Sequence, residues 1–182
     1  MEPIAADFYS RRNLAKPSTT SDNGPENCIW QVKKEYGHDG AASLRGMKRD
    51  NWEGGHRVPF VARWPGKIKP GTTSGEVLCL TDLMATAAAI VGAELPDGAG
   101  EDSYNMLPAL LGKRPDRPIN YSRARIPIQP PITRPDAPGQ LYDLSRDLGE
   151  TKNLYKRHPE VVRRLSELLE KYKREGRSRR PG

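Results

Sequence analysis

Residues 52–60 read Trp-Glu-Gly-Gly-His-Arg-Val-Pro-Phe, and this stretch decides how the surrounding chain is organised. Its adjacent glycines permit backbone shapes that other residues resist, which is typical of a tight loop. Apolar residues then alternate from Val58 to Trp64, a pattern that predicts a strand with Pro59 near its start. The dipeptide Pro65-Gly66 predicts the turn that follows. The chain is therefore expected to pass here from a polar loop into a strand.

Asp22 and Asn23 stand side by side upstream of this stretch, followed by Gly24 and Pro25. A carboxylate next to an amide carbonyl offers hard oxygen ligands that suit Ca²⁺ or Mg²⁺. All four residue types also favour turns for backbone reasons, so an ordinary turn is the alternative interpretation. The residues alone leave both interpretations open.

Lys48 lies between these two stretches, in a loop-like segment just before the paired glycines. A lysine beside such a flexible backbone is a candidate for binding an anion. The alternative is that Lys48 is one of 30 basic residues on a solvated face. Its position alone does not separate the two.

Periodic patterns further along the chain predict regular elements. Thr81-Asp82 is a capping signal for a helix with helically spaced apolar residues over 83–91, and Gly92 is expected to end it. Residues 141–144 read as a short strand. Pro159 is expected to open an amphipathic helix, whose apolar side is formed by Val161, Val162, Leu165, Leu168, Leu169 and Tyr172.

The composition limits which partners the chain is expected to have. The formal net charge is +7, but four arginines of that excess stand in the final segment, where we expect a frayed tail. No basic stripe with interleaved aromatic residues indicates nucleic-acid binding. No segment has the length and apolarity of a membrane span, and the first twenty residues do not form a secretory signal. The chain as written would stay in the cytoplasm, but its location is left open.

The order and approximate spacing of Ser21–Pro25, Lys48 and Trp52–Phe60 resemble those of the arylsulfatases, the type I formylglycine-dependent sulfatase family. The resemblance continues through several later segments, namely Arg63–Gly66, Thr81–Leu83, Leu107–Gly112, Leu141–Leu144 and Gly149–Leu154. It implies an α/β fold, the C-terminal part of an alkaline-phosphatase-like sulfatase fold with a small antiparallel sheet and a C-terminal helix.

The residue patterns and the resemblance together predict how the chain divides. We expect an irregular leader over 1–20, the end of a catalytic domain over 21–112, a Pro-rich connection over 113–140, a C-terminal strand and helix over 141–175, and a basic tail over 176–182. Prolines within the connection should limit strand pairing there.

By the same resemblance, Asp22 and Asn23 look like the second pair of ligands to a divalent metal, Ca²⁺ or Mg²⁺. Lys48 looks like the lysine that binds the sulfate and offsets charge on the leaving group. Glu53 and Arg57 are expected to fix the loop, while His56 has no assigned role. The implied metal needs further ligands from an N-terminal sulfatase half.

The nucleophile of this family is a cysteine in a Cys-x-Pro-Ser-Arg context, which is oxidised to formylglycine. Neither Cys28 nor Cys79 has that context. The resemblance therefore implies a sulfuric ester hydrolase whose substrate is a sulfate ester, aryl or carbohydrate, and this chain alone is expected to be inactive. The alternative is a degenerate, non-catalytic remnant or an anion-binding module.

Overall fold

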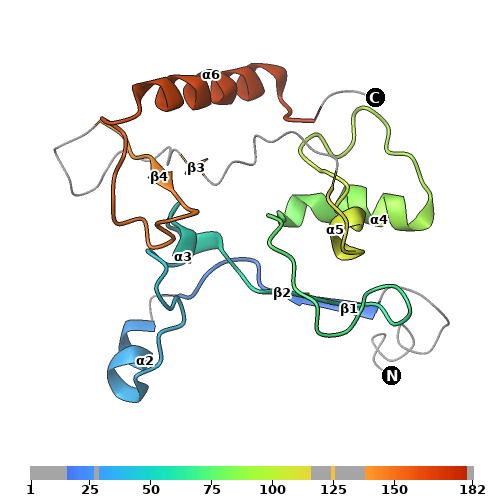
Figure 1. The fold of residues 1–182 in the computed structure, drawn as a ribbon, viewed down its shortest axis with the longest axis horizontal. Helices are drawn as coiled ribbons and strands as arrows, with labels where there is room; N and C mark the ends of the chain where they lie inside the picture. The colour runs from blue at the N-terminus through green and yellow to red at the C-terminus, as the bar shows by residue number, and fades with distance from the viewer. Residues whose placement is uncertain (1–15, 27–28, 116–123, 126–137, 180–182) are drawn as a thin grey trace. The chain divides into compact units, whose positions relative to one another are not determined.

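The computed structural model describes residues 16–26, 29–115, 124–125 and 138–179, and Figure 1 shows their helices and strands. The chain divides into two compact units. The first unit is built from Met1–Thr20, Pro59–Arg117 and Arg179–Gly182, and the second from Ser21–Val58 and Pro118–Ser178.

The sheet of the first unit joins β1 (Lys16–Thr20) to β2 (Phe60–Arg63) as an antiparallel pair, with Thr20 opposite Phe60. The predicted strand is confirmed over Phe60–Arg63. Pro59, predicted inside the strand near its start, lies just before it, since proline has no N–H to donate. The expectation of an irregular leader over 1–20 is wrong for its last five residues. Their Ser and Thr side chains suit a strand, and β2 pairs with their backbone.

The helices of the first unit follow this sheet as η1 (Leu80–Asp82), α4 (Leu83–Val91) and α5 (Leu107–Leu110). The predicted helix over 83–91 is confirmed, and it ends at Gly92, whose φ of 71° is the left-handed conformation that glycine adopts readily. The capping interpretation is only half right. Asp82 stands at the N-cap but makes no side-chain bond to the helix, because its carboxylate accepts bonds from other backbone groups.

Asp82 is the centre of a buried polar cluster in this unit. It has no exposed surface, and its carboxylate accepts hydrogen bonds from the backbone of Cys79 at 2.9 Å and Tyr104 at 3.0 Å. The buried Thr86 hydroxyl donates to the Asp82 carbonyl at 2.7 Å and accepts from the Met106 backbone at 2.9 Å. Polar bonds therefore join α4 to the segment that leads into α5.

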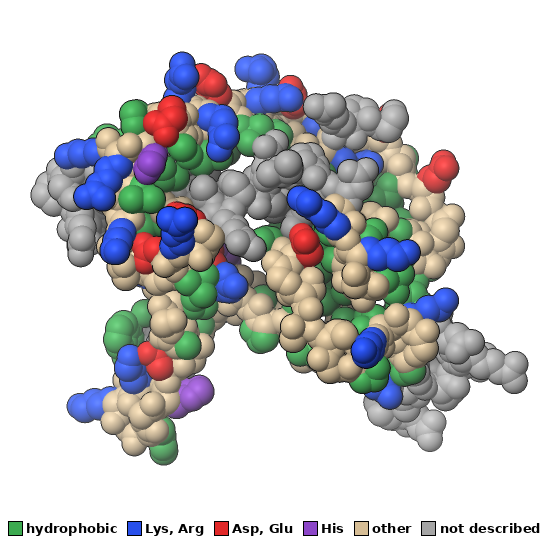
Figure 2. Space-filling view, in the orientation of Figure 1, with side chains coloured by type: hydrophobic (Ala, Val, Ile, Leu, Met, Phe, Trp, Pro, Cys, Tyr) green, Lys and Arg blue, Asp and Glu red, His purple; other side chains and the backbone are tan. Residues whose placement is uncertain are grey.

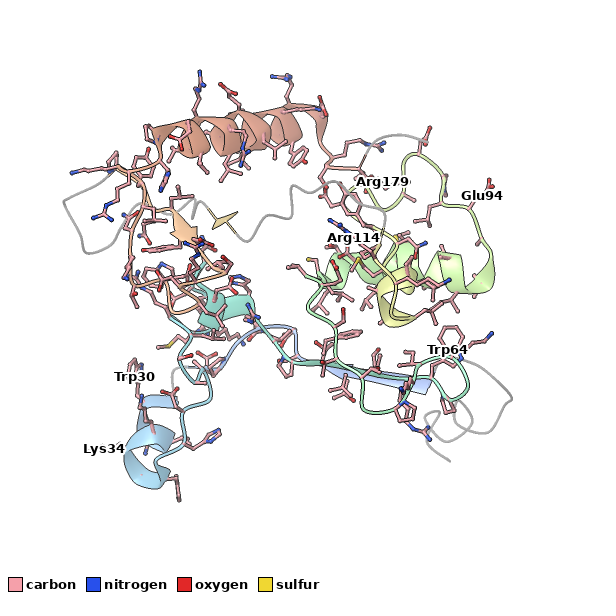
Figure 3. All side chains as sticks on the ribbon, in the orientation of Figure 1. Trp30, Lys34, Trp64, Glu94, Arg114 and Arg179 are labelled. Carbon is pink, nitrogen blue, oxygen red and sulfur yellow. The ribbon has the colours of Figure 1, made fainter. Side chains whose placement is uncertain are left out.

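Arg179, which is labelled in Figure 3, belongs to the first unit rather than to a frayed tail. Its guanidinium donates to the carbonyls of Ala99 at 2.9 Å and Gly100 at 3.2 Å, and its backbone donates to Glu101 at 2.9 Å. The expectation of fraying is thus wrong at this residue, because the carbonyls of a Gly-containing turn pair with its donors.

The second unit contains α2 (Ile29–Tyr36), α3 (Glu53–His56), β3 (Ala124–Arg125), β4 (Tyr142–Asp143) and α6 (Pro159–Glu175). The predicted strand at 141–144 is confirmed as β4, which pairs antiparallel with β3. The predicted helix opened by Pro159 is confirmed as α6, and the apolar side named above is half-buried. Figure 2 shows basic and acidic side chains interspersed along this helix.

The two units differ from the predicted ranges. The predicted catalytic-domain range 21–112 is divided between them, with Ser21–Val58 in the second unit and the residues from Pro59 onward in the first. The divisions at 112 and 140 stay predictions. Among the helices that the structure describes, none has the length and apolarity to cross a membrane.

Candidate functional site

Asp22 and Asn23 lie in the loop that follows β1, within the second unit. The Ser21 hydroxyl donates to the Asn23 carbonyl at 2.9 Å, which folds the loop back on itself. The Gly24 N–H donates to the Gly55 carbonyl at 2.9 Å. A Cβ at residue 24 would lie 1.8 Å from the carbonyl oxygen of Gly54, so only glycine fits this contact.

Lys48 lies at the second position of a tight turn from Met47 to Asp50. The turn is closed twice, because the Asp50 N–H donates to the Met47 carbonyl and the Asp50 carboxylate accepts from the Met47 N–H, both at 2.9 Å. Arg49, at the third position, has a φ of 80°, as a type II turn requires. This turn carries Lys48 at its tip.

The two loops meet through their backbones. The Lys48 N–H donates to the Pro25 carbonyl at 2.8 Å, two residues after Asn23. The Lys48 ammonium lies 3.5 Å from the Glu26 carboxylate, and Arg49 pairs with the same carboxylate at 2.5 Å. Partly exposed ion pairs of this kind are worth little net free energy, so an anion in solution can compete for the two cations.

Asp22 and Asn23 offer a carboxylate and an amide oxygen, which is the ligand chemistry of Ca²⁺. Within the described ranges, neither side chain makes a hydrogen bond or ion pair. The described residues contain no group of three or more His, Cys, Asp and Glu that would hold a metal ion. Asp22 and Asn23 therefore offer two oxygen donors, and the described residues hold no complete metal site.

Glu53, the first residue of α3, fixes the segment that follows the tight turn. It is buried, its carboxylate accepts from Arg57 at 2.9 Å, and the His56 ring lies 3.4 Å away. The predicted role of Glu53 and Arg57 agrees with this ion pair. The His56 ring thus lies beside the same carboxylate as Arg57.

Sequence reasoning missed the residues that hold this loop from a distance. The Glu53 N–H donates to the buried Glu150 carboxylate at 2.8 Å, across 97 residues of chain. The Trp52 indole donates to the Gln140 side chain at 3.0 Å, across 88 residues. The resemblance covers 141–144 and 149–154, but no spacing in one sequence indicates which residues these segments meet.

Asp147 closes the turn that presents Glu150. Its carboxylate accepts from the Thr151 N–H at 3.0 Å, the Thr151 hydroxyl at 2.8 Å and the Lys152 N–H at 2.8 Å. Burial works to raise the pKa of Asp147, but these donors together with the nearby Lys152 charge outweigh it, so the pKa is lowered from its usual value. The turn also sets Glu150 at a φ of 53°.

Because the folded pKa of Asp147 is lowered, its stabilisation should be fully present above the unfolded value of about 3.9 and lost as the pH falls through the folded value. Thr151→Ala removes one donor and should raise the pKa of Asp147, which carboxyl ¹³C NMR titration measures. Thr73→Ala, at an exposed position, should leave it unchanged. An Asp147 carboxyl that titrates above the usual range would contradict the prediction.

Several known proteins are similar to this chain. The family model described as Sulfatase matches residues 19–93. An N-acetylgalactosamine-6-O-sulfatase of Bacteroides thetaiotaomicron is 36% identical over 85% of this chain and 35% of its own length. Arylsulfatase G of Rattus norvegicus is 38% identical over 50% of this chain and 16% of its own length. The chain thus spans much less than these relatives do.

Two solved structures are also similar to this chain. A structure described under the metabolism of multiple glycosaminoglycans by Bacteroides thetaiotaomicron matches 86% of this chain and 38% of its own, with a TM-score of 0.70 and 34% identity. The crystal structure of Ps i-CgsB in complex with k-i-k-neocarrahexaose matches 85% of this chain and 35% of its own, with a TM-score of 0.64. At 23% identity the latter supports the fold alone.

Residues 19–93 match the Sulfatase family model, and the chain corresponds to a C-terminal region of the sulfatases that it resembles. Its fold is the C-terminal part of the alkaline-phosphatase-like sulfatase fold, as the sequence predicted.

Proposed function

We propose that this chain supplies the sulfate-binding lysine and two metal ligands of a formylglycine-dependent sulfuric ester hydrolase. The observation that carries the proposal is the 2.8 Å hydrogen bond from the Lys48 N–H to the Pro25 carbonyl. It joins the turn of Lys48 to the loop of Asp22 and Asn23. The backbone segments that carry the Lys48 ammonium and the two proposed metal ligands thereby meet at this bond.

Each of these residues has a defined task in the proposed reaction. Asp22 and Asn23 would hold Ca²⁺, which polarises the sulfate group when bound. The Lys48 ammonium binds a sulfate oxygen and offsets the negative charge that develops on the leaving group. Glu26 is the carboxylate that the sulfate would displace from Lys48.

The substrate we propose is a carbohydrate sulfate rather than an aryl or steryl sulfate. The match to the N-acetylgalactosamine-6-O-sulfatase extends over 85% of this chain. The match to the steryl-sulfatase of Mus musculus extends over 51%. The match to the carbohydrate sulfatase therefore includes more of this chain.

The purified chain alone should not hydrolyse a sugar sulfate in the presence of Ca²⁺, because neither Cys28 nor Cys79 has the context of the nucleophile. Mixing it with the N-terminal part of the Bacteroides relative, which would supply the nucleophile and the remaining ligands, should restore sulfate release. Lys48→Ala should then lower the rate about a hundredfold, the usual effect of removing one charge-stabilising donor. Released sulfate is measured by ion chromatography.

Lys67→Ala is the matched control, because Lys67 is exposed and distant in sequence from both loops. It should leave the restored rate unchanged. Turnover by the chain alone, or a restored rate that is indifferent to Lys48, would contradict the proposal. Sulfate binding that depends on Lys48 without any restored turnover would instead support the alternative, a non-catalytic anion-binding module.

A further inference from the structure

Arg45 makes contacts in three directions at the start of the loop that carries Lys48. Its guanidinium carbon lies 3.9 Å from the centroid of the Trp52 ring. One guanidinium nitrogen donates to the Tyr142 hydroxyl at 2.9 Å and to the Glu150 carbonyl at 3.1 Å. One side chain thus joins this loop to two C-terminal segments.

The backbone of Arg45 closes the same loop. Its carbonyl accepts from the Gly54 N–H at 2.7 Å, so residues 45 and 54 meet at the base of the loop, and Lys48 lies between them. A Cβ on Gly54 would lie 2.6 Å from the Arg45 carbonyl oxygen, so the two sides of the loop approach closely at its base. A shift of Arg45 would therefore move the base on which the turn of Lys48 rests.

The C-terminal residues around Arg45 are buried and hydrogen-bonded to one another. The Gln140 side-chain oxygen accepts from the Trp52 indole at 3.0 Å and from the Tyr142 hydroxyl at 2.8 Å. Gln140 is 7% exposed, Tyr142 is 3% exposed and Glu150 is 1% exposed. Buried, hydrogen-bonded groups of this kind hold a single geometry, because a displaced member would lose its partner away from water.

We propose that Arg45 is a positioning residue through which Gln140, Tyr142 and Glu150 set the place of the Lys48 turn against the loop of Asp22 and Asn23. What Lys48 does there rests on the proposed function, but its placement does not. The role needs arginine in particular. A planar guanidinium stacks on an indole and donates in several directions at once, whereas a lysine ammonium offers a point charge and cannot do both.

The test compares Arg45→Lys with wild type in the full chain. Amide hydrogen exchange at Lys48 and Gly54 should speed up about tenfold, because the base of the loop opens more often. The NMR signal of the Trp52 indole N–H, assigned with Trp52→Phe, should shift, since the guanidinium leaves the ring. Exchange in β2 and α6 should stay as in wild type. Arg63→Lys, an exposed arginine of β2, is the matched control and should change neither readout.

Tyr142→Phe is the second variant, because it keeps the ring and removes the hydroxyl that Arg45 and Gln140 share. It should speed exchange at Lys48 in the same direction. Unchanged exchange at Lys48 in both variants would overturn the proposal. Exchange that speeds up equally in β2 and α6 would also overturn it, because Arg45 would then stabilise the whole chain.

Inorganic sulfate binding is measured in parallel. If the wild-type chain binds no sulfate, the proposed function of Lys48 fails. The hydrogen-exchange data would still decide whether Arg45 positions the Lys48 turn.

Discussion

Replacing Gly24 with alanine should separate the loop of Asp22 and Asn23 from the turn of Lys48 and abolish the site. The new Cβ would lie 1.8 Å from the Gly54 carbonyl oxygen, 2.9 Å from its carbonyl carbon and 3.1 Å from that of Gly55. All these atoms are backbone, so no side-chain rotation relieves the overlap. The N–H groups of Gly54 and Gly55 also donate to the carbonyls of Arg45 and Trp52, which holds this backbone in place. The expected cost is about 3 kcal/mol, at the upper end for overpacking.

Hydrogen exchange of the amides of Gly24 and Lys48 measures this separation, since both donate across the junction in wild type. Both should lose their protection in Gly24→Ala, and any sulfate-release activity of the complemented enzyme should fall to background. Gly75→Ala is the matched control, because its Cβ would meet nothing within 4 Å. Wild-type protection at both amides in Gly24→Ala would refute this account of the loop contact.

Elements that depend on a local pattern could be predicted from the sequence. The alternation that indicates β2, the helical spacing of α4 and the amphipathic period of α6 are each complete within one segment. The strand β1 could not be predicted in this way. Its residues Lys16–Thr20 are polar, and they form a strand because β2 pairs with them across about forty residues.

The functional site could likewise be predicted only as far as local sequence patterns reach. The order of motifs was enough to single out Asp22, Asn23 and Lys48 as candidates. It did not reveal that the Lys48 turn places a non-glycine residue, Arg49, at a φ of 80°. Nor did it reveal the bonds from Arg45 to Tyr142 and Glu150, because their partners stand 97 and 105 residues further along the chain. Contacts of that kind are settled by packing, which no local pattern encodes.

Asp82→Ala should be the most destabilising change in the first unit. The buried carboxylate accepts the N–H groups of Cys79 and Tyr104, and alanine would leave both donors without their present acceptor. An unpaired buried donor costs about 1–3 kcal/mol, and the Tyr104 N–H is the more deeply buried of the two. We therefore expect a loss of about 3–4 kcal/mol in the free energy of unfolding of this unit.

Exchange of the α4 amides across a urea series measures that loss, and Glu94→Ala provides the control. Glu94, which is labelled in Figure 3, is an exposed carboxylate in the segment after α4. Its removal should change stability by less than about 0.5 kcal/mol. Asp82→Asn should fall between the two, because the amide oxygen can still accept one N–H while its NH₂ group faces the other. Equal stability for Asp82→Ala and Glu94→Ala would mean that the cluster around Asp82 and Thr86 does not hold α4 to the segment before α5.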